Sequence, residues 1–146
     1  MLSASKKRYL FSIGKLSLNG QKISCKEIAD DLCVKPPSVS KMLTLLAGED
    51  LIEKAHYGKI TLTEKGLRPA NQLYTNFLIL SSFFHNLLLL PEEQAVKDAA
   101  TCVCELSEEC IAGLVSLAMR HPEVPGRRTG QTEEAETTPE NLIYKI

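Results

Sequence analysis

Residues 24–62 read SCKEIADDLCVKPPSVSKMLTLLAGEDLIEKAHYGKITL and decide the fold of the chain. Ser24 followed three residues later by Glu27 forms a capping box, which predicts that a helix begins here. The pair Pro36-Pro37 suits a turn that leads into a second helix, because proline lacks the N–H that the first turn of a helix leaves unpaired. The stretch is therefore predicted to hold two amphipathic helices separated by a tight turn.

Two short segments follow the second helix, at residues 51–54 and 59–62, and each combines two apolar with two polar residues. They flank Tyr57-Gly58, so they are expected to pair as a β-ribbon. Helix, turn, helix and ribbon in this order are typical of a winged helix-turn-helix. In that fold the second helix enters the DNA major groove and the ribbon lies beside it. The order indicates a transcription regulator rather than an enzyme.

Helical periodicity continues on both sides of this motif, and the chain is predicted to be mainly α. Before the motif, a helix is expected over residues 6–18, with Ser5 as its N-cap. In the second motif helix, the inward face is expected to hold Val39, Met42, Leu43 and Leu46. After the ribbon, three helices are predicted at about residues 63–88, 91–106 and 108–120.

These elements divide the chain into three predicted parts. Residues 1–68 form a winged helix-turn-helix DNA-binding domain, and residues 69–121 form a helical dimerisation domain. Proline, glycine, arginine, threonine and glutamate dominate most of residues 122–146, which predicts a disordered tail. The apolar residues of the later helices exceed what a small monomer can cover, so a homodimer is expected. The residues assigned to its interface are Leu87, Leu88, Val103, Leu106, Ile111, Leu114 and Val115.

The net charge of −1 conceals two halves of opposite sign. Residues 1–68 carry 12 Lys and Arg against 7 Asp and Glu, a charge of +5, whereas residues 69–146 carry 5 against 11, a charge of −6. A basic half with a DNA-reading motif and an acidic half without one suggest a division of labour. The sequence holds no glycine-rich phosphate loop, no GxSxG and no HExxH motif, so an enzyme is not expected.

No apolar run in the sequence is long enough to span a bilayer, and the first residues lack the apolar core of a signal peptide. A cytoplasmic protein without a membrane partner is therefore expected. Its five cysteines are then expected to be reduced thiols.

The outward face of the second motif helix carries hydroxyl groups and a lysine, which can reach base edges and phosphates. The residues of this helix assigned to double-stranded DNA are Pro37, Ser38, Ser40, Lys41 and Thr44. The flanking residues assigned to DNA are Lys26, Lys35, Tyr57 and Lys59. For the helix alone, the alternative is a solvated face with scattered lysines. For the whole domain, it is a winged helix that binds protein instead of DNA.

The chain resembles the diphtheria toxin repressor family, the iron- and manganese-dependent repressors, over residues 7–122. The resemblance is strongest in KEIADDLCVKPPSVSKM at 26–42 and LTEKG at 62–66, and continues through DAATCVCELS at 98–107. It implies a homodimeric repressor in which metal ions switch on DNA binding. The SH3-like third domain of larger members has no counterpart in the sequence, so the chain resembles the short, manganese-regulator-like branch.

The resemblance also implies a manganese or iron site, and there the chain departs from the family. The family draws His, Glu, Asp, Cys or Met ligands from the first helix, the long linking helix and the first dimerisation helix. Aligned without gaps, these places hold Arg8, Phe11, Asn76 or Phe77, Ser81, Val96, Ala100, Val103 and Cys104. Only Cys104 can ligate a metal as it stands, and Arg8 puts a positive charge where the cation would sit. The metal switch is therefore expected to be lost, or altered around Cys104, Glu105 and Glu108.

Overall fold

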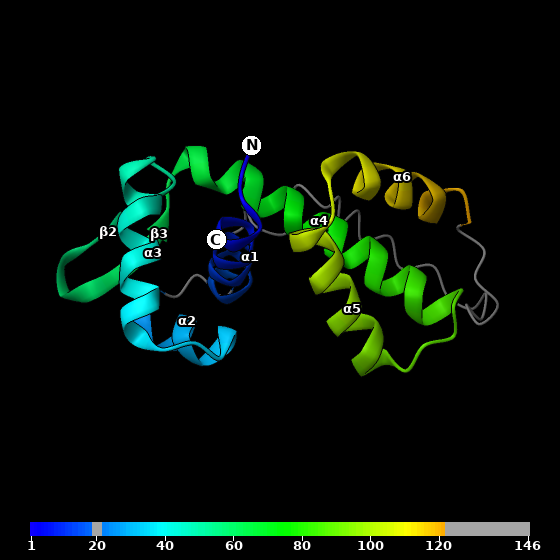
Figure 1. Ribbon diagram of the computed structural model, residues 1–146, viewed down its shortest axis with the longest axis horizontal. Helices are drawn as coiled ribbons and strands as arrows, with labels where there is room; N and C mark the ends of the chain where they lie inside the picture. Colours follow the sequence, from blue (N-terminus) through cyan, green and yellow to red (C-terminus); the bar gives the residue numbers. More distant parts are fainter. Residues whose placement is uncertain (19–21, 122–146) are drawn as a thin grey trace, which may run out of the picture. The chain divides into compact units, whose positions relative to one another are not determined.

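The structure is a computed structural model that describes residues 1–18 and 22–121. Contacts divide these residues into two compact units, one of residues 1–74 and one that continues from residue 75. Within the described residues the fold has six α-helices and a three-stranded sheet (Figure 1). The mainly α fold with a winged helix-turn-helix and following helices is therefore confirmed. The tail predicted to be disordered, residues 122–146, lies outside the described residues.

The first unit begins with three helices, α1 (Ala4–Ser17), α2 (Cys25–Leu32) and α3 (Pro36–Gly48). The capping box of α2 is confirmed. The Ser24 N–H donates to the Glu27 carboxylate at 2.7 Å, and the Glu27 N–H donates to the Ser24 hydroxyl at 3.3 Å.

The predicted cap of α1 was wrong. Ser3, not Ser5, is the N-cap, and its hydroxyl accepts from the Lys6 N–H. Ala4 is a strong helix former and Ser3 caps as well as any serine, so the helix extends two residues further toward the N-terminus than the periodicity suggested.

The core face of α3 is narrower than predicted. Val39 and Leu46 are fully buried and Leu43 is 3% exposed, whereas Met42 is only half-buried. On a helix with 100° between residues, the three buried side chains fall within about 60° of one another and Met42 lies at their margin. The assignment of Met42 to the inward face is corrected accordingly.

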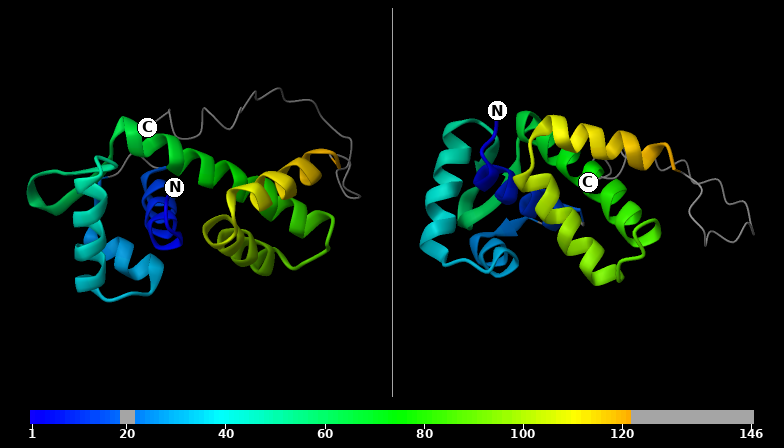
Figure 2. Two further views of the ribbon diagram at one scale, coloured as in Figure 1. Left: turned by 45° about the horizontal axis from the view of Figure 1, so that its top comes forward. Right: turned by 45° about the vertical axis from the view of Figure 1, so that its right-hand side comes forward.

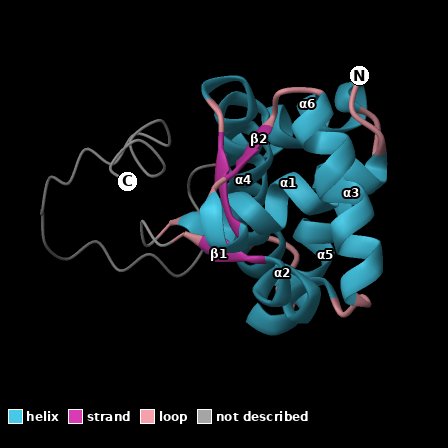
Figure 3. Cartoon of the chain, turned by 90° about the vertical axis from the view of Figure 1, so that its left-hand side faces the viewer, coloured by secondary structure: helices cyan, strands magenta, loops and turns pink. Residues whose placement is uncertain are grey.

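The sheet comprises β1 (Ile23–Ser24), β2 (Ile52–Lys54) and β3 (Lys59–Leu62) in the order β1-β3-β2, with both pairs antiparallel (Figure 3). The β2–β3 ribbon is confirmed. The third strand, β1, was not predicted, because two residues are too short to show alternation. It joins the ribbon to the helices, since Ile23 pairs with Ile60 and both are buried.

The long helix α4 (Glu64–Asn86) begins directly after β3. The Thr63 hydroxyl caps it by accepting from the Gly66 N–H at 3.0 Å, and it donates to the Asp50 carbonyl at 2.7 Å. A Cβ atom placed at Gly66 would overlap the carbonyl oxygen of Leu51 and come within 2.8 Å of the carbonyl carbon. The first turn of α4 therefore packs directly on the backbone that precedes β2.

The second unit contains the C-terminal part of α4, helix α5 (Glu92–Glu105) and helix α6 (Glu108–Met119) (Figure 2). All three predicted helices after the ribbon are thus present. Ser107 caps α6 by accepting from the Cys110 N–H. The buried apolar residues of this unit are Phe77, Leu80, Phe83, Phe84, Ala95, Ala99, Val103, Cys104 and Ile111. No helix among residues 1–18 and 22–121 combines the length and the hydropathy needed to span a bilayer.

Gly66→Ala should lower the free energy of unfolding by about 3 kcal/mol, because the new methyl group meets backbone atoms that cannot turn away. Chemical denaturation followed by circular dichroism measures the change. Gly48→Ala is the matched control, since a Cβ at Gly48 meets nothing within 4 Å. That variant should be neutral or slightly more stable because alanine favours the helix. Equal stability of the two variants would show that the contact between Gly66 and Leu51 does not constrain the fold.

Candidate nucleic-acid interface

The surface that the sequence assigned to DNA lies on the side of α3 away from its core face. Pro37, Lys41 and Thr44 project opposite to the buried residues, and Ser38 and Ser40 lie on either side of them. All five side chains are exposed. The structure therefore brings the predicted residues of this helix together on one open face.

A hydrogen bond from the ribbon fixes the wing side of this face. The Lys54 ammonium of β2 donates to the Thr44 hydroxyl at 3.0 Å, and that hydroxyl donates to the Ser40 carbonyl at 3.0 Å. Thr44 is thus engaged within the protein, and Lys54 places its charge at the edge of the α3 face. Lys54 was not among the assigned residues. The signal in the sequence was that Lys54 is a charged residue of a short ribbon strand.

The start of α3 offers few backbone groups to a phosphate. Pro36 and Pro37 have no N–H, and the N–H groups of Ser38 and Val39 donate to the Lys35 carbonyl at 3.0 and 3.4 Å. An open helix N-terminus normally attracts anions through its free N–H groups. Here that contribution is reduced, so contacts to the DNA backbone depend on side chains.

The tip of the wing holds an aromatic side chain in a strained position. Tyr57 has a φ of 67° and Gly58 a φ of 69°, and the Ala55 N–H closes the loop on the Lys59 carbonyl at 2.7 Å. A left-handed conformation is uncommon for residues other than glycine and costs on the order of 1 kcal/mol. The Tyr57 ring is nevertheless 100% exposed. The side chain therefore lies in solvent, and it gains no apolar burial that would offset the cost of the left-handed backbone.

Exposed lysines occur on both motif helices, at the N-cap of α3 and on the wing strands. The exposed lysines of this region are Lys22, Lys26, Lys35, Lys41, Lys54 and Lys59. Lys59 also donates to the Lys22 carbonyl at 3.5 Å. The nearby acid Glu27 is held by hydrogen bonds from Ser24, which lower its carboxyl pKa, and Lys59 lowers that pKa further. The surface combines lysine ammonium groups with hydroxyl donors and acceptors, as a nucleic-acid interface does.

A part-buried hydrogen-bonded cluster holds α2 against α1. Asp31 of α2 accepts from the Ser12 hydroxyl at 2.6 Å and from the Lys15 ammonium at 2.6 Å. Ser12 is fully buried. Sequence reasoning missed this cluster, because no spacing rule relates residues of two different helices. Its effect is to set the position of α2, and through the turn that of α3.

The residues proposed for a rebuilt metal site do not form one. Cys104 is 5% exposed, whereas Glu105 and Glu108 are exposed. Among residues 1–18 and 22–121, no group of three His, Cys, Asp or Glu side chains is placed to hold a metal ion. The guanidinium, phenyl, hydroxyl and aliphatic groups of Arg8, Phe11, Ser81 and Ala100 do not suit a divalent cation. The donor set of this chain therefore does not fit manganese or iron.

Residues 1–60 match the family described as iron-dependent repressor, N-terminal DNA-binding domain. An uncharacterised HTH-type transcriptional regulator of Methanocaldococcus jannaschii is 30% identical over 106 residues, which cover 73% of this chain and 82% of that protein. The manganese regulator SloR is 31% identical with a TM-score of 0.66, over 80% of this chain and 54% of SloR.

This chain therefore spans about half the length of SloR. IdeR of T. acidophilum, at 23% identity, shares the fold with a TM-score of 0.68, over 93% of this chain and 66% of IdeR. The chain belongs to the iron-dependent repressor family of helix-turn-helix transcription regulators.

Proposed function

We propose that the chain is a homodimeric transcriptional repressor that binds double-stranded DNA through residues 1–68, dimerises through residues 69–121, and works in the cytoplasm without the family's metal switch. The observation that carries the DNA-binding role is the open α3 face, where Lys41 and hydroxyl groups are exposed beside a lysine-bearing wing. An enzyme is not proposed, because the surface holds polar groups suited to reading DNA and the family acts as regulators.

Base contacts are assigned to Lys41, Ser38 and Ser40, with Pro37 beside them in the major groove. A lysine can donate to the O6 and N7 of guanine, and serine hydroxyls can donate or accept at any base edge. Thr44 remains assigned to DNA binding in an indirect role. Its hydroxyl accepts a hydrogen bond from Lys54 and so positions that lysine beside the α3 face. Phosphate contacts are assigned to Lys26, Lys35, Lys59 and, at the tip of the wing, Tyr57.

Lys41→Ala should weaken binding to the operator by about 1–3 kcal/mol, because the variant loses a donor to a base edge or a phosphate. An operator selected from a random duplex library serves as the ligand, and fluorescence anisotropy at several salt concentrations measures affinity. Wild-type affinity should fall steeply with salt, since each phosphate contact releases counterions.

Lys97→Ala is the matched control for this experiment. Lys97 is an exposed lysine of α5, in the second unit, and its ammonium pairs with the Glu93 carboxylate at 2.9 Å. Its removal lowers the positive charge of the chain by the same amount and should leave operator affinity within about twofold. Equal losses in the two variants, or binding that does not respond to salt, would contradict the assignment of α3.

The homodimer is inferred from the exposed apolar surface of the second unit. Leu87 is 37% exposed and Leu88 is 54% exposed, while Leu106, Leu114 and Val115 are half-buried. Val103 and Ile111 are already buried in the single chain, at 2% and 5%, so they offer little surface to a second copy. The proposed interface is therefore narrower than the sequence suggested. Leu89, Val96, Leu117 and Met119 are exposed apolar residues of the same unit.

Leu88→Glu and Leu114→Glu should each convert the dimer to a monomer, because the carboxylate would be buried without a partner at an apolar interface. Sedimentation at micromolar concentration measures the mass, and circular dichroism verifies folding. Ser116→Glu is the control on α6, since Ser116 is exposed and polar. A wild-type chain that sediments as a monomer would refute the homodimer.

Manganese and ferrous iron should bind weakly or not at all to the purified chain, and operator binding should survive EDTA. The guanidinium of Arg8 repels a divalent cation, and aliphatic side chains provide no lone pairs. Calorimetric titration with manganese measures binding. The alternative is a metal-responsive regulator that uses Cys104 and acidic neighbours. A micromolar manganese site whose loss in Cys104→Ala also abolishes operator binding would establish that alternative.

A further inference from the structure

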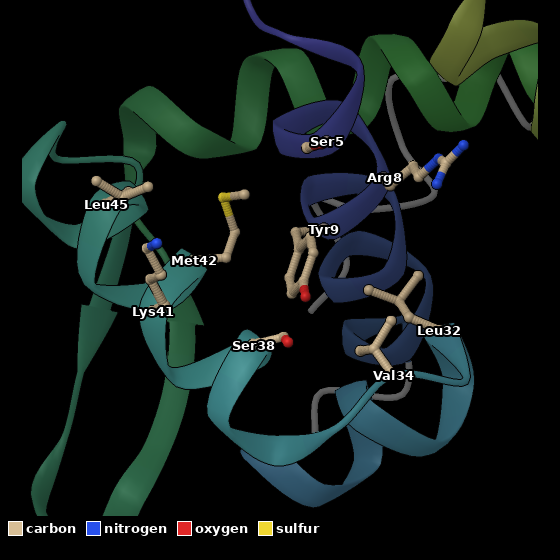
Figure 4. Close-up of a pocket in the computed structure, with 9 residues that line it drawn as sticks. All are labelled: Ser5, Arg8, Tyr9, Leu32, Val34, Ser38, Lys41, Met42 and Leu45. Atoms are coloured by element: carbon tan, nitrogen blue, oxygen red, sulfur yellow. The ribbon is translucent and has the colours of Figure 1, made fainter.

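A pocket of about 420 Å³ lies between α1 and α3 in the first unit, on the flank of α3 opposite the wing (Figure 4). Its volume falls within the range of small-molecule sites. Side chains from α1, from the end of α2 with the following turn, and from α3 line it. Two of them, Ser38 and Lys41, belong to the proposed DNA-reading face.

The wall that α3 contributes changes character along the helix. Ser38, Lys41, Met42 and Leu45 line the pocket at spacings of three and four residues, so they share one flank of the helix. Ser38 and Lys41 belong to the N-terminal half of this flank and Met42 and Leu45 to the C-terminal half, and the Lys41 ammonium points along the helix toward Leu45 (Figure 4). Leu45 is 48% exposed although it lies well inside a helix. This flank therefore offers polar and apolar groups side by side, which suits an amphipathic ligand.

The facing walls add apolar surface and a hydroxyl group. Leu32 and Val34 lie on one side of the Tyr9 ring, and Met42 lies on the other (Figure 4). The Tyr9 hydroxyl points toward Ser38 (Figure 4). Burial raises the pKa of the Tyr9 phenol, and the Cys25 thiol raises it further. The Tyr9 hydroxyl therefore stays protonated at neutral pH and can donate a hydrogen bond into the pocket.

The charge of the lining favours an anion. Of the described residues that line the pocket, none is acidic and two, Arg8 and Lys41, are basic. The Arg8 guanidinium points away from the Tyr9 ring, whereas Lys41 lies one helical turn from Ser38 on the α3 flank (Figure 4). The basic group that can turn toward an anion in the pocket is thus the exposed Lys41, and the hydroxyls of Ser38 and Tyr9 are further donors.

We propose that this pocket binds a small amphipathic carboxylate, with its carboxylate at Lys41 and Ser38 and its apolar part on Met42, Leu45 and the Tyr9 ring. A ligand in this position covers two groups assigned to DNA, so it releases the repressor from its operator. The release rests on the proposed DNA-binding function, whereas binding of the carboxylate does not. The pocket would then be the effector site of a repressor that has no metal switch.

Sodium octanoate is the test ligand, with octanol and octyltrimethylammonium as neutral and cationic counterparts of equal chain length. Calorimetry on the DNA-free full chain should give a dissociation constant of about 0.1–1 mM for octanoate. Octanol and the ammonium compound should bind at least about tenfold more weakly, because they cannot accept a charge-assisted hydrogen bond from Lys41. Octanol that binds as tightly as octanoate would overturn the assignment of an anion.

Lys41→Gln and Leu45→Glu test the location. Both side chains are exposed, so the variants should fold, and each should weaken octanoate binding by about tenfold. Lys26→Gln is the control, because Lys26 is exposed on α2 and does not line the pocket. It should weaken operator binding but leave octanoate binding unchanged. Unchanged octanoate affinity in both pocket variants would overturn the proposal.

Competition completes the test and separates the two proposals. Octanoate should lower operator affinity, and operator DNA should lower octanoate affinity by the same factor, because linkage is reciprocal. A chain that binds its operator but no octanoate at 10 mM, a concentration about tenfold above the weakest expected dissociation constant, refutes the pocket alone. A chain that binds octanoate at Lys41 but no DNA supports the pocket and refutes the proposed function.

Discussion

The close approach of Gly66 to the Leu51 carbonyl is the constraint on which the arrangement of the first unit depends. At this corner the end of α3, the start of β2, the end of β3 and the start of α4 meet within a few residues. The Leu51 N–H donates to the Leu46 carbonyl at 3.0 Å, and the Leu51 carbonyl accepts from the Thr63 N–H at 3.1 Å. Because backbone meets backbone here, the wing cannot shift relative to α3 without breaking several hydrogen bonds at once.

A second set of contacts orients the other end of the motif. Asp31 holds α2 to α1 through Ser12 and Lys15, and the buried Val39, Leu43 and Leu46 anchor α3. Lys54 then links β2 to Thr44. The polar face of α3 is therefore presented by a frame that is fixed at both ends. A rigid frame reduces the entropy that the reading side chains lose when they bind, which raises the affinity obtained from each contact.

Local rules made most of the fold predictable. The Ser24–Glu27 capping box, the prolines in the first turn of α3 and the Tyr57-Gly58 turn each specify their element through neighbouring residues, and each was found as expected. Features that join distant residues were missed. The two-residue strand β1 has no pattern of its own, and the Asp31 cluster relates two separate helices.

The predicted sites show the same contrast between what neighbouring residues specify and what distant residues specify. Periodicity identifies the apolar face of a helix but not what covers it, so Val103 and Ile111 were assigned to a dimer interface although the chain itself buries them. Met42 was placed in the core for the same reason, whereas it lines a pocket. The exposed residues of α3 were identified correctly as exposed, because hydroxyls and a lysine opposite an apolar face can only point to solvent.

On α3, the residues that pack in the core and the residues that face solvent form two separate sets. Val39, Leu43 and Leu46 are buried, and Pro37, Ser40 and Lys41 have no part in the core. Exchanging an exposed residue of this kind changes folding stability by about 0.5 kcal/mol or less. A duplicated copy of the gene could therefore drift to a different recognition sequence through a few single substitutions, each tolerated as it arises. Divergence among such paralogues would be limited by the number of compatible binding sites in the genome, not by the ability of the protein to fold.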